Sequence, residues 1–542
     1  MVDPKLRGIA VGPMFSRLYD IMVNGRMESW YSPNPEQAAK KKQGCVVQIF
    51  GLFLMLDMAL YCGKTLFIGL LDFEKAFDFM NRPTLMQKMM KDSIGCIFLK
   101  NLYNMYKEIR YHPKISSNLM DEPILSEHGV TQGRNSSGNI FSYYISDMNE
   151  PMERKGYVDF MLANLLQLAD DSLILAELIK SLLLKFSDTF GYCADIFCIV
   201  NMDKTNYMEF SKEPSLEDLV IDDNVIKPVD PKVGYVWLGF HLSYNSEIHL
   251  LIAHNLKKKK SNEAKFYAWL NINKDTPFPF KLNVVYACFF PAILYSCEAW
   301  GDITAHVEEL LIMERKALRA ILGVKKSTPD NILYVELNRC DIIHSIRQRQ
   351  FNFFKSFLQL TPEESTTRGI WQRYQQWSNN SPKPFLEYYV SLTETSEEQN
   401  LSHKKEMIST SDTSMHERYR SLIGFEHCRV LYSSIVSDHY RCIITRWRLS
   451  CHPLFIETGR YKRPKPPRIE RTCLICTVVE DEEHALLSCR AHVEIRHQHR
   501  RLLAEYKTAK EILHPRSTED IISIGKYLQD IEENMDKLKI KR

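Results

Sequence analysis

The stretch Asn164–Leu175 decides the fold, because it reads NLLQLADDSLIL and sets Asp170 and Asp171 side by side inside an apolar run. Two interpretations of it are open. In a helix, its leucines would face a core while both aspartates point to water. In a hairpin, LLQLA and SLILA would be two short strands, and the aspartates would lie at the tight turn between them. This stretch alone favours neither.

A third carboxylate, that of Asp72, favours the hairpin. The apolar run Leu66–Leu71 has the length of a strand and ends at Asp72, and a helix start follows with Pro83 at a first helical position. An acid at the C-terminal end of a strand lies where ligands bind in many sheet-based enzymes. The alternative is that Asp72 only caps the next helix.

The aspartates together predict a magnesium site. If Asp72 and Asp170 meet on adjacent strands, they supply the carboxylate oxygens that Mg²⁺ prefers. Adjacent carboxylates repel each other unless cations neutralise them, so a tolerated Asp-Asp turn indicates a metal. Two such ions, about 3.5–4 Å apart, can activate an attacking oxygen and stabilise the leaving oxygen in phosphoryl transfer.

Composition indicates a globular protein with two or three domains, since the 542 residues are 45% hydrophobic and 25% charged. The formal net charge is only +3, so attraction to a polyanion must come from local clusters. Residues Arg441–Arg471 form one such cluster, with nine Lys or Arg, two Glu and a local balance of +7, and Lys257–Lys260 form another.

The cysteines predict an intracellular protein of the nucleus, the cytoplasm or both. The chain has 14 of them, scattered except for a C-terminal set, and no signal peptide is visible. The longest apolar run, Val46–Leu60, contains Asp57 and is expected to be too short for a membrane span. We therefore expect no membrane partner.

The order of motifs along the chain resembles a reverse transcriptase of the non-LTR (LINE-type) retrotransposons. The palm-like motifs are LLDFEKAFDFMNR at 70–82, GVTQGRNSSGNIFSYYISDM at 129–148, LQLADDSLI at 166–174, NMDKTNYMEF at 201–210 and VWLGFHL at 236–242. Upstream, LRGIAVGPMFSRLYDIMVNGRMESW and NPEQAAKKKQGCVVQIFGLF resemble the fingers motifs of that family. The resemblance implies an α+β right-hand polymerase with fingers, a palm containing an antiparallel sheet, and a helical thumb.

The resemblance also implies the roles of individual residues. Asp72 and Asp170 would bind two catalytic Mg²⁺ ions, with Asp171 assisting, and Lys204 would protonate the departing pyrophosphate. The other roles belong to the nucleotide and the primer. Residues expected at the nucleotide are Phe73, whose carbonyl is a further metal ligand, Phe77, which favours dNTP over NTP, Gln132, Gly133 and Lys41, and those at the primer end are Leu238 and Gly239.

Three motifs depart from the family pattern. Leu168 stands where an aromatic residue usually precedes Ala-Asp-Asp, and Ser136–Gly138 occupy a region that commonly holds a proline. The fingers pattern Gln-Ala-Gly-Phe-Arg reads Gln-Ala-Ala-Lys-Lys at 37–41, so Lys41 replaces the arginine expected on the triphosphate. Lysine keeps the charge but loses the bidentate geometry.

Helical patterns follow the palm from Leu256 on, with Pro277, Pro279 and Pro291 between them. They resemble a polymerase thumb, in which Lys257–Lys260, Arg315, Lys316 and Arg319 would contact the duplex backbone; ordinary solvated helix faces are the alternative. We expect five parts: fingers and palm at 1–250, helical thumb or connection at 251–360, a flexible polar linker at 361–420, a basic segment with a zinc module at 421–500, and a helical tail at 501–542.

Four C-terminal residues have the spacing of a zinc site. Cys473, Cys476, His484 and Cys489 form C-x2-C-x7-H-x4-C, which suits tetrahedral Zn²⁺ with a structural role because no coordination position stays open. The same spacing resembles the C-terminal zinc-binding module of non-LTR reverse transcriptases. The adjacent basic segment would bind phosphates, and Trp447 or Tyr461 could stack on a base, although a core position is the alternative for the tryptophan.

The expected function is RNA-directed DNA polymerisation on an RNA template and a DNA primer or target, with dNTPs as substrates. The endonuclease of a full non-LTR element is not visible, and the chain starts abruptly in a helical pattern, which predicts a truncated or degraded copy. A catalytically silent nucleic-acid-binding protein is the rival from another class. A template-independent nucleotidyltransferase is a third reading.

Overall fold

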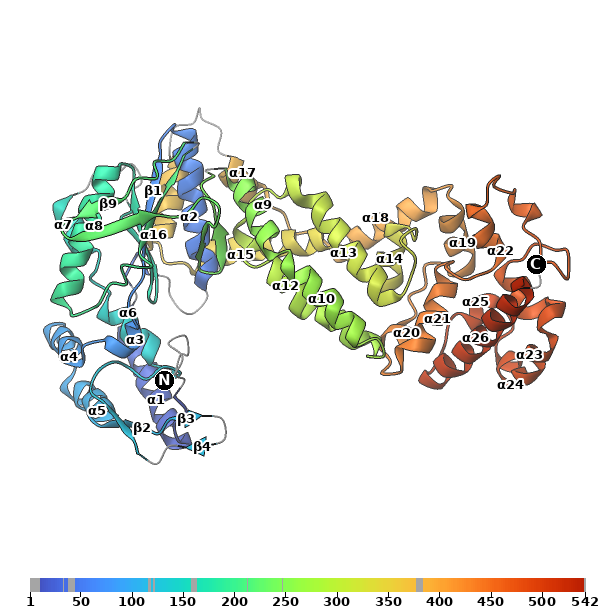
Figure 1. The fold of residues 1–542 in the computed structure, drawn as a ribbon, viewed down its shortest axis with the longest axis horizontal. Helices are drawn as coiled ribbons and strands as arrows, with labels where there is room; N and C mark the ends of the chain where they lie inside the picture. The colour runs from blue at the N-terminus through green and yellow to red at the C-terminus, as the bar shows by residue number, and fades with distance from the viewer. Residues whose placement is uncertain are drawn as a thin grey trace. The chain divides into compact units, whose positions relative to one another are not determined.

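The computed structural model describes residues 10–32, 34–37, 44–115, 118–119, 122–156, 163–211, 213–245, 247–376 and 384–540 (Figure 1). The chain divides into two compact units. The first unit comprises residues 1–257, 296–302 and 350–392, and the second comprises 258–295, 303–349 and 393–542. The fold is a mixture of helices and sheet, as predicted, with the main sheet in the first unit.

The main sheet has six strands in the order β6-β7-β1-β8-β10-β9. Every neighbouring pair is antiparallel except β8 and β10, which are parallel. The strands are β1 (Leu66–Leu71), β6 (Leu165–Leu168), β7 (Asp171–Ala176), β8 (Asn206–Phe210), β9 (Leu219–Ile221) and β10 (Asn224–Pro228). The predicted strand Leu66–Leu71 is confirmed, and it lies in the middle of the sheet.

Helices cover both faces of this sheet, which explains why its central strands are apolar on both sides (Figure 1). Helix α8 (Ile179–Asp195) packs on one face, where Gly69 of β1 leaves room for Phe186: a Cβ at Gly69 would lie 2.4 Å from the phenylalanine ring. Helix α2 (Gly44–Tyr61) lies against β1 and β6 on the other face.

Helix α2 is apolar throughout and largely buried, because it is a core helix of the first unit. By length and composition its 18 residues could cross a membrane, but 72% of them are buried inside the structure. The expectation that this run is too short for a span is therefore wrong. Among the described residues, α2 is the one helix that meets the length and composition of a span.

The remaining elements of the first unit flank the sheet. Helix α1 confirms the helical pattern read near the N-terminus, and α4 starts at Arg82 with Asn81 as its cap, so Pro83 lies in its first turn as expected. These elements are α1 (Met14–Trp30), α3 (Ala76–Phe79), α4 (Arg82–Lys91), α5 (Cys96–Tyr106), β2 (Ile109–Tyr111), β3 (Lys114–Ile115), β4 (Asn118–Leu119), β5 (Ile124–Ser126), α6 (Ser137–Tyr144), α7 (Glu150–Lys155), β11 (Tyr235–Trp237), β12 (Phe240–Leu242) and η2 (Cys297–Ala299).

The polar segment 361–420 is folded where the structure describes it, so the expectation of a flexible linker is wrong. It contains α16 (Thr366–Gln376), α17 (Pro384–Ser391), α18 (Glu397–Thr410) and most of α19 (Ser414–Leu422). Several of its large apolar residues, among them Trp371 and Tyr389, are buried, and Trp371 stacks on Phe50 of α2. Low average hydrophobicity concealed these widely spaced anchors.

The second unit is helical in its described residues. Its helices follow the predicted succession after the palm, and α26 forms the expected helical tail. The bounds are α9 (Ile248–Lys259), which begins in the first unit, α10 (Ser261–Ile272), α11 (Phe278–Val284), η1 (Val285–Phe289), α12 (Phe290–Ile293), η3 (Thr304–His306), α13 (Val307–Leu322), α14 (Asp330–Leu337), α15 (Ile342–Leu360), α20 (Arg429–Ser433), α21 (Asp438–Arg448), α22 (Phe455–Thr458), η4 (Gly459–Tyr461), η5 (Arg468–Glu470), η6 (His484–Ser488), η7 (Arg490–His492), α23 (Val493–Gln498), α24 (Arg500–Glu505), α25 (Ala509–Ile512) and α26 (Thr518–Ile540).

Candidate active site

The stretch around the paired aspartates is a hairpin. Strands β6 and β7 pair with Leu168 opposite Asp171, so Ala169 and Asp170 form a two-residue turn. Ala169 has a φ of 54°, and a positive φ at the first turn position matches the twist of paired strands. The hairpin interpretation is confirmed and the helical one is wrong.

The register of the sheet brings Asp72 to this turn. In the ladder between β1 and β7, Leu71 is opposite Ser172, and one further step sets Asp72 opposite Asp171. In the ladder between β1 and β8, Leu70 is opposite Asn206, and Lys204 lies two residues before Asn206, in the turn that leads into β8. Three segments that are distant in the sequence therefore end at one edge of the sheet.

The backbone of Asp72 is held on the β8 side, and one of its carboxylate oxygens is available to a ligand. Its N–H donates to Thr205 Oγ1 at 3.3 Å, and its carbonyl accepts from the Asn201 N–H at 2.8 Å. Asp72 Oδ2 is buried without a hydrogen bond from any described residue, and Lys204 Nζ lies 3.5 Å from it. A buried oxygen in this state fits the donor set of a hard cation such as Mg²⁺.

Negative charge at this edge of the sheet affects the pKa of Tyr235. The sequence motifs did not indicate this residue. Burial, followed by the negative charges of Asp72 and Asp171, raises the pKa of its hydroxyl to about 12. Both carboxylates therefore act on one phenol at the start of β11. A tyrosine directly before the VWLG motif was the signal that could have pointed to it.

A second Asp-Asp pair shows that the dipeptide alone does not define a site. Asp222 and Asp223 form the two-residue turn between β9 and β10 in the same sheet, and Asp222 has a φ of 51°. Both are exposed, and β8 and β10 separate their strand β9 from β1. Convergence with Asp72 and Lys204 therefore distinguishes the turn that contains Asp170.

Phe73 and Phe77 follow the β1 end as the resemblance requires. Phe73 makes a bridge with Val200, and Phe77 lies half-buried on α3 with its ring 4.9 Å from that of Phe141. Gly129 allows the next motif to pass close by: a Cβ there would come within 2.4 Å of the Phe77 carbonyl oxygen. The roles of both phenylalanines at a nucleotide stay predictions.

The other nucleotide and primer residues lie in turns. Gln132 Nε2 lies 3.3 Å from Asp78 Oδ1, and Gly133 is exposed with a φ of 99°. Leu238 and Gly239 form the turn of the hairpin between β11 and β12, with φ values of 47° and 78°. A leucine with positive φ is strained, which favours a functional constraint on this turn. Lys41 lies outside the described residues.

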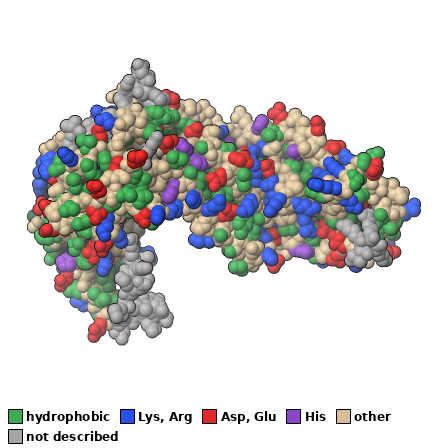
Figure 2. Space-filling model, turned by 45° about the horizontal axis from the view of Figure 1, so that its top comes forward, with side chains coloured by type: hydrophobic (Ala, Val, Ile, Leu, Met, Phe, Trp, Pro, Cys, Tyr) green, Lys and Arg blue, Asp and Glu red, His purple; other side chains and the backbone are tan. Residues whose placement is uncertain are grey.

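Three of the predicted thumb cations are engaged in ion pairs within the second unit. Lys316 Nζ lies 2.6 Å from Glu263, and Arg315 lies 2.9 Å from Asp330, which also pairs with Arg319. Lys259 is buried under the ring of Tyr295, so the run Lys257–Lys260 does not present a continuous basic surface. Figure 2 shows Lys and Arg side chains interspersed with Asp and Glu on the visible face.

The C-terminal Cys and His residues come together as predicted. One ligand atom from each of Cys473, Cys476, His484 and Cys489 lies within 4.8 Å of the others. The Cys489 sulfur lies 3.7 Å from that of Cys473 and 4.0 Å from that of Cys476. His484 Nε2 is buried with no described hydrogen-bond partner, whereas its Nδ1 contacts Ser488 Oγ at 3.2 Å. A hydrogen bond at one ring nitrogen that leaves the other for a cation is typical of metal sites.

The basic segment beside this cluster is largely neutralised. Arg441 and Arg448 are buried in ion pairs with Asp438 and Glu336. Trp447 is fully buried and donates to Glu532, so the core position is confirmed for this residue and stacking on a base is excluded. Tyr461 is 60% exposed, and Lys462, Arg463 and Lys465 are exposed after it, which leaves this short loop as the accessible basic part of the segment.

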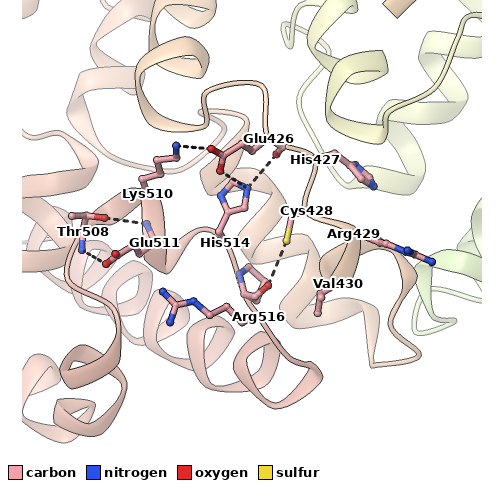
Figure 3. Close-up of a pocket in the computed structure, with 11 residues that line it drawn as sticks. Glu426, His427, Cys428, Arg429, Val430, Thr508, Lys510, Glu511, His514 and Arg516 are labelled. Atoms are coloured by element: carbon pink, nitrogen blue, oxygen red, sulfur yellow. Dashed lines mark hydrogen bonds and ion pairs between the residues drawn. The ribbon is translucent and has the colours of Figure 1, made fainter. Parts of the chain in front are cut away.

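A further cavity lies elsewhere in the second unit. It has a volume of about 530 Å³, and its walls come from the segments 426–430 and 508–516 (Figure 3). Lys510 and His514 both point to Glu426, at 2.9 Å and 3.7 Å (Figure 3). This cavity contains none of the predicted site residues.

The comparison with protein families finds a match for the part of the chain that contains the main sheet. Residues 3–242 match the family model described as reverse transcriptase (RNA-dependent DNA polymerase). The chain therefore contains a reverse transcriptase domain, the enzyme class of the RNA-directed DNA polymerases, which are nucleotidyltransferases. The match includes Asp72, the hairpin turn at Asp170 and the turn at Leu238. A comparison with curated proteins finds no match.

Solved structures of telomerase are distantly similar. The telomerase of Candida albicans in complex with a fragment of telomeric RNA is 12% identical, with a TM-score of 0.29, over 70% of this chain and 59% of that chain. Apo telomerase from Candida tropicalis, truncated of its C-terminal domain, is 15% identical, with a TM-score of 0.24, over 39% of this chain and 43% of that chain. The chain spans about half the length of these proteins, and TM-scores this low carry no argument.

Proposed function

We propose that the protein is an RNA-directed DNA polymerase that extends a DNA primer along an RNA template with dNTPs. The observation that carries the proposal is the convergence of Asp72, Asp171 and Lys204 on one sheet edge, next to the turn formed by Ala169 and Asp170. The family match over residues 3–242 supports the same reaction class.

Asp72 and Asp170 would hold two Mg²⁺ ions, and the buried Oδ2 of Asp72 is the oxygen best suited to a cation. When bound, the ions would activate the primer 3′-hydroxyl and stabilise the leaving pyrophosphate. Lys204 Nζ, 3.5 Å from Asp72, would donate a proton to the departing pyrophosphate. Phe77 on α3 would favour a sugar without a 2′-hydroxyl.

We infer a non-LTR element as the origin of the chain. The order of the five palm motifs supports this class, and so does the C-x2-C-x7-H-x4-C cluster in the second unit. The cluster would hold one structural Zn²⁺ and keep the exposed loop at Lys462–Lys465 in place to contact nucleic acid. The separate endonuclease of such elements would have to come from another polypeptide or segment.

A reducing intracellular compartment, the nucleus or the cytoplasm, agrees with the state of the cysteines. All 14 cysteines are described and none forms a disulfide. Thiolates that remain reduced are also the form that binds Zn²⁺. Localisation of the full chain fused to a fluorescent protein tests this inference, and secretion into the medium would contradict it.

The test of the proposed function is primer extension on an RNA template in Mg²⁺, with Asp170→Asn as the inactive reference. Extension by the wild type that is lost in the variant supports the proposal. The rival function, nucleic-acid binding without catalysis, is favoured by one observation, the replacement of the fingers arginine by Lys41. Salt-dependent RNA binding with no dNTP incorporation by the wild type would select the rival.

A further inference from the structure

Three buried glutamines lie together behind the hairpin that contains the catalytic aspartates. Gln37, Gln48 and Gln167 are 6%, 2% and 1% exposed, and Gln37 forms a short parallel bridge with Gln167 on β6. Amide side chains at this depth are stable only when they are hydrogen-bonded. The partners of these amides therefore show what the cluster holds in place.

Gln37 uses its whole amide group to join three elements. Its Oε1 accepts from the Tyr31 hydroxyl at 2.8 Å and from the Asn34 N–H at 3.3 Å. Its Nε2 donates to the Ser142 carbonyl on α6 at 2.8 Å and to Gln167 Oε1 at 2.9 Å. The side chain thereby ties the end of α1, helix α6 and strand β6 to one point.

Gln167 connects Gln37 by hydrogen bonds to both strands of the hairpin. Its Nε2 donates to Ser172 Oγ on β7 at 3.1 Å, and its backbone N–H donates to the Glu36 carbonyl at 3.0 Å. Gln48 Nε2 joins the Gln167 and Glu36 carbonyls from α2, at 3.0 Å and 3.1 Å. Gln167 precedes Asp170 by three residues, and Ser172 directly follows Asp171, so the cluster holds the hairpin on both sides of its turn.

We propose that Gln37 is a positioning residue, which fixes the aspartate turn relative to the end of α1 and to helix α6. The inference rests on the proposed function. Because directional hydrogen bonds at Gln37 hold the strand that leads into the turn, their loss changes where Asp170 meets a metal and a triphosphate. Displacements of about 1 Å can lower the rate about 100-fold.

The test compares Gln37→Met with a matched variant, Gln350→Met, in the full-length chain. Gln350 is also fully buried in the first unit: its Nε2 donates to the Cys297 and Gly301 carbonyls at 3.1 Å and 2.8 Å, and the Tyr388 hydroxyl donates to its Oε1 at 2.7 Å. Both substitutions remove similar buried hydrogen bonds at similar volume, so both should lower Tm. Only the first removes a bond to the aspartate hairpin.

The expected result is a rise of about fivefold or more in the half-saturating Mg²⁺ concentration and in KM for dNTP for Gln37→Met. Gln350→Met should leave both values unchanged when rates are normalised to folded protein. The double variant Gln37→Met/Gln167→Met should show less than the sum of the two single effects, because each single substitution already removes the bond between the two side chains. Equal shifts in Gln37→Met and Gln350→Met, or no shift in either, would overturn the inference while the polymerase assignment stands. A wild type that incorporates no dNTP would instead refute the proposed function, on which the inference depends.

Discussion

Lys204 Nζ lies 3.5 Å from Asp72 Oδ2, because Lys204 lies in the turn just before β8, the strand that pairs with β1. The lysine side chain is 66% exposed and that of the aspartate 31%, so the lysine is the more accessible of the two side chains. A lysine in this position can neutralise a carboxylate before substrate binds and donate a proton afterwards.

Lys204→Met should lower kcat for primer extension by about 100-fold or more, with a small change in KM for dNTP, because general acid catalysis is typically worth that much. Lys204→Arg separates charge from proton donation, since arginine keeps the charge but does not release its proton. We expect arginine to restore little of the rate in single-turnover measurements. Full activity of Lys204→Met would contradict a catalytic role.

Buried Glu36 should make the stability of the first unit depend on pH. Burial, followed by repulsion from Glu153 and Glu150, raises the pKa of its carboxyl from 4.5 to about 7. Because the pKa is higher in the folded state than in the unfolded state, the protonated carboxyl contributes to the free energy of unfolding. This contribution is fully present below about pH 4.5 and is lost as pH rises through about 7. Glu36→Gln should therefore gain stability relative to the wild type between pH 5 and pH 8, by up to about 3 kcal/mol.

Thermal unfolding of both proteins at pH 5 and pH 8 measures this difference. Exposed Glu217 of the same unit supplies the control, because Glu217→Gln should change Tm equally at the two pH values. If the Tm difference between Glu36→Gln and the wild type is the same at both pH values, the buried carboxyl does not titrate as we expect.

The fully buried pair of Glu336 and Arg448 should be the most costly ion pair to break in the second unit. Arg448 Nε donates to Glu336 Oε1 at 2.5 Å, and the hydroxyls of Tyr432 and Tyr419 donate to the same carboxylate. Burial acts to raise the pKa of Glu336, but Arg448 and the tyrosine hydroxyls hold it below its usual value. Glu336→Gln leaves a buried guanidinium without its counter-charge, which costs about 3–5 kcal/mol.

Denaturant unfolding of Glu336→Gln beside Glu308→Gln tests this expectation. The Glu308 side chain is 70% exposed and pairs with Arg315 at 3.2 Å, so its loss should cost less than about 1 kcal/mol. Similar small losses for the two variants would show that Arg448 finds another partner.

The cysteine and histidine cluster should bind one Zn²⁺ per chain and lose it when one ligand is removed. We expect Cys489→Ala to abolish bound zinc and to destabilise the second unit, because a structural metal contributes directly to folding. Exposed Cys288 gives the matched control, since Cys288→Ala should keep the metal. Elemental analysis of the two purified variants measures their zinc content. Zinc retained by Cys489→Ala would refute the site.

The sequence predicted the elements whose residues carry a local signal. The strand Leu66–Leu71, the hairpin at Asp170 and the C-x2-C-x7-H-x4-C cluster depend on short-range patterns, and all three occur as expected. Whether the cations of the basic segment are neutralised depends on residues that are distant in the sequence. Glu336, for example, neutralises Arg448 from 112 residues away. Patterns within a segment cannot indicate such partners.

The buried glutamines illustrate the same limit. Gln167 in the run LLQLA and Gln48 in an apolar helix were visible as polar residues in apolar surroundings. Their contact with Gln37 depends on the register between separate segments, which only the fold supplies. Likewise, Asp222 and Asp223 repeat the signal of Asp170 and Asp171 without their partners, so the three-dimensional arrangement was needed to distinguish the two turns.

The most direct test of the aspartate site compares two substitutions at the same position of two hairpin turns in one sheet. Asp170 and Asp223 are each the second residue of a two-residue turn whose first residue has a positive φ. Primer extension on RNA with Mg²⁺ should fall to background for Asp170→Asn and stay at the wild-type rate for Asp223→Asn. Equal activity of the two variants would contradict the claim that Asp72 and Asp170 form the catalytic centre.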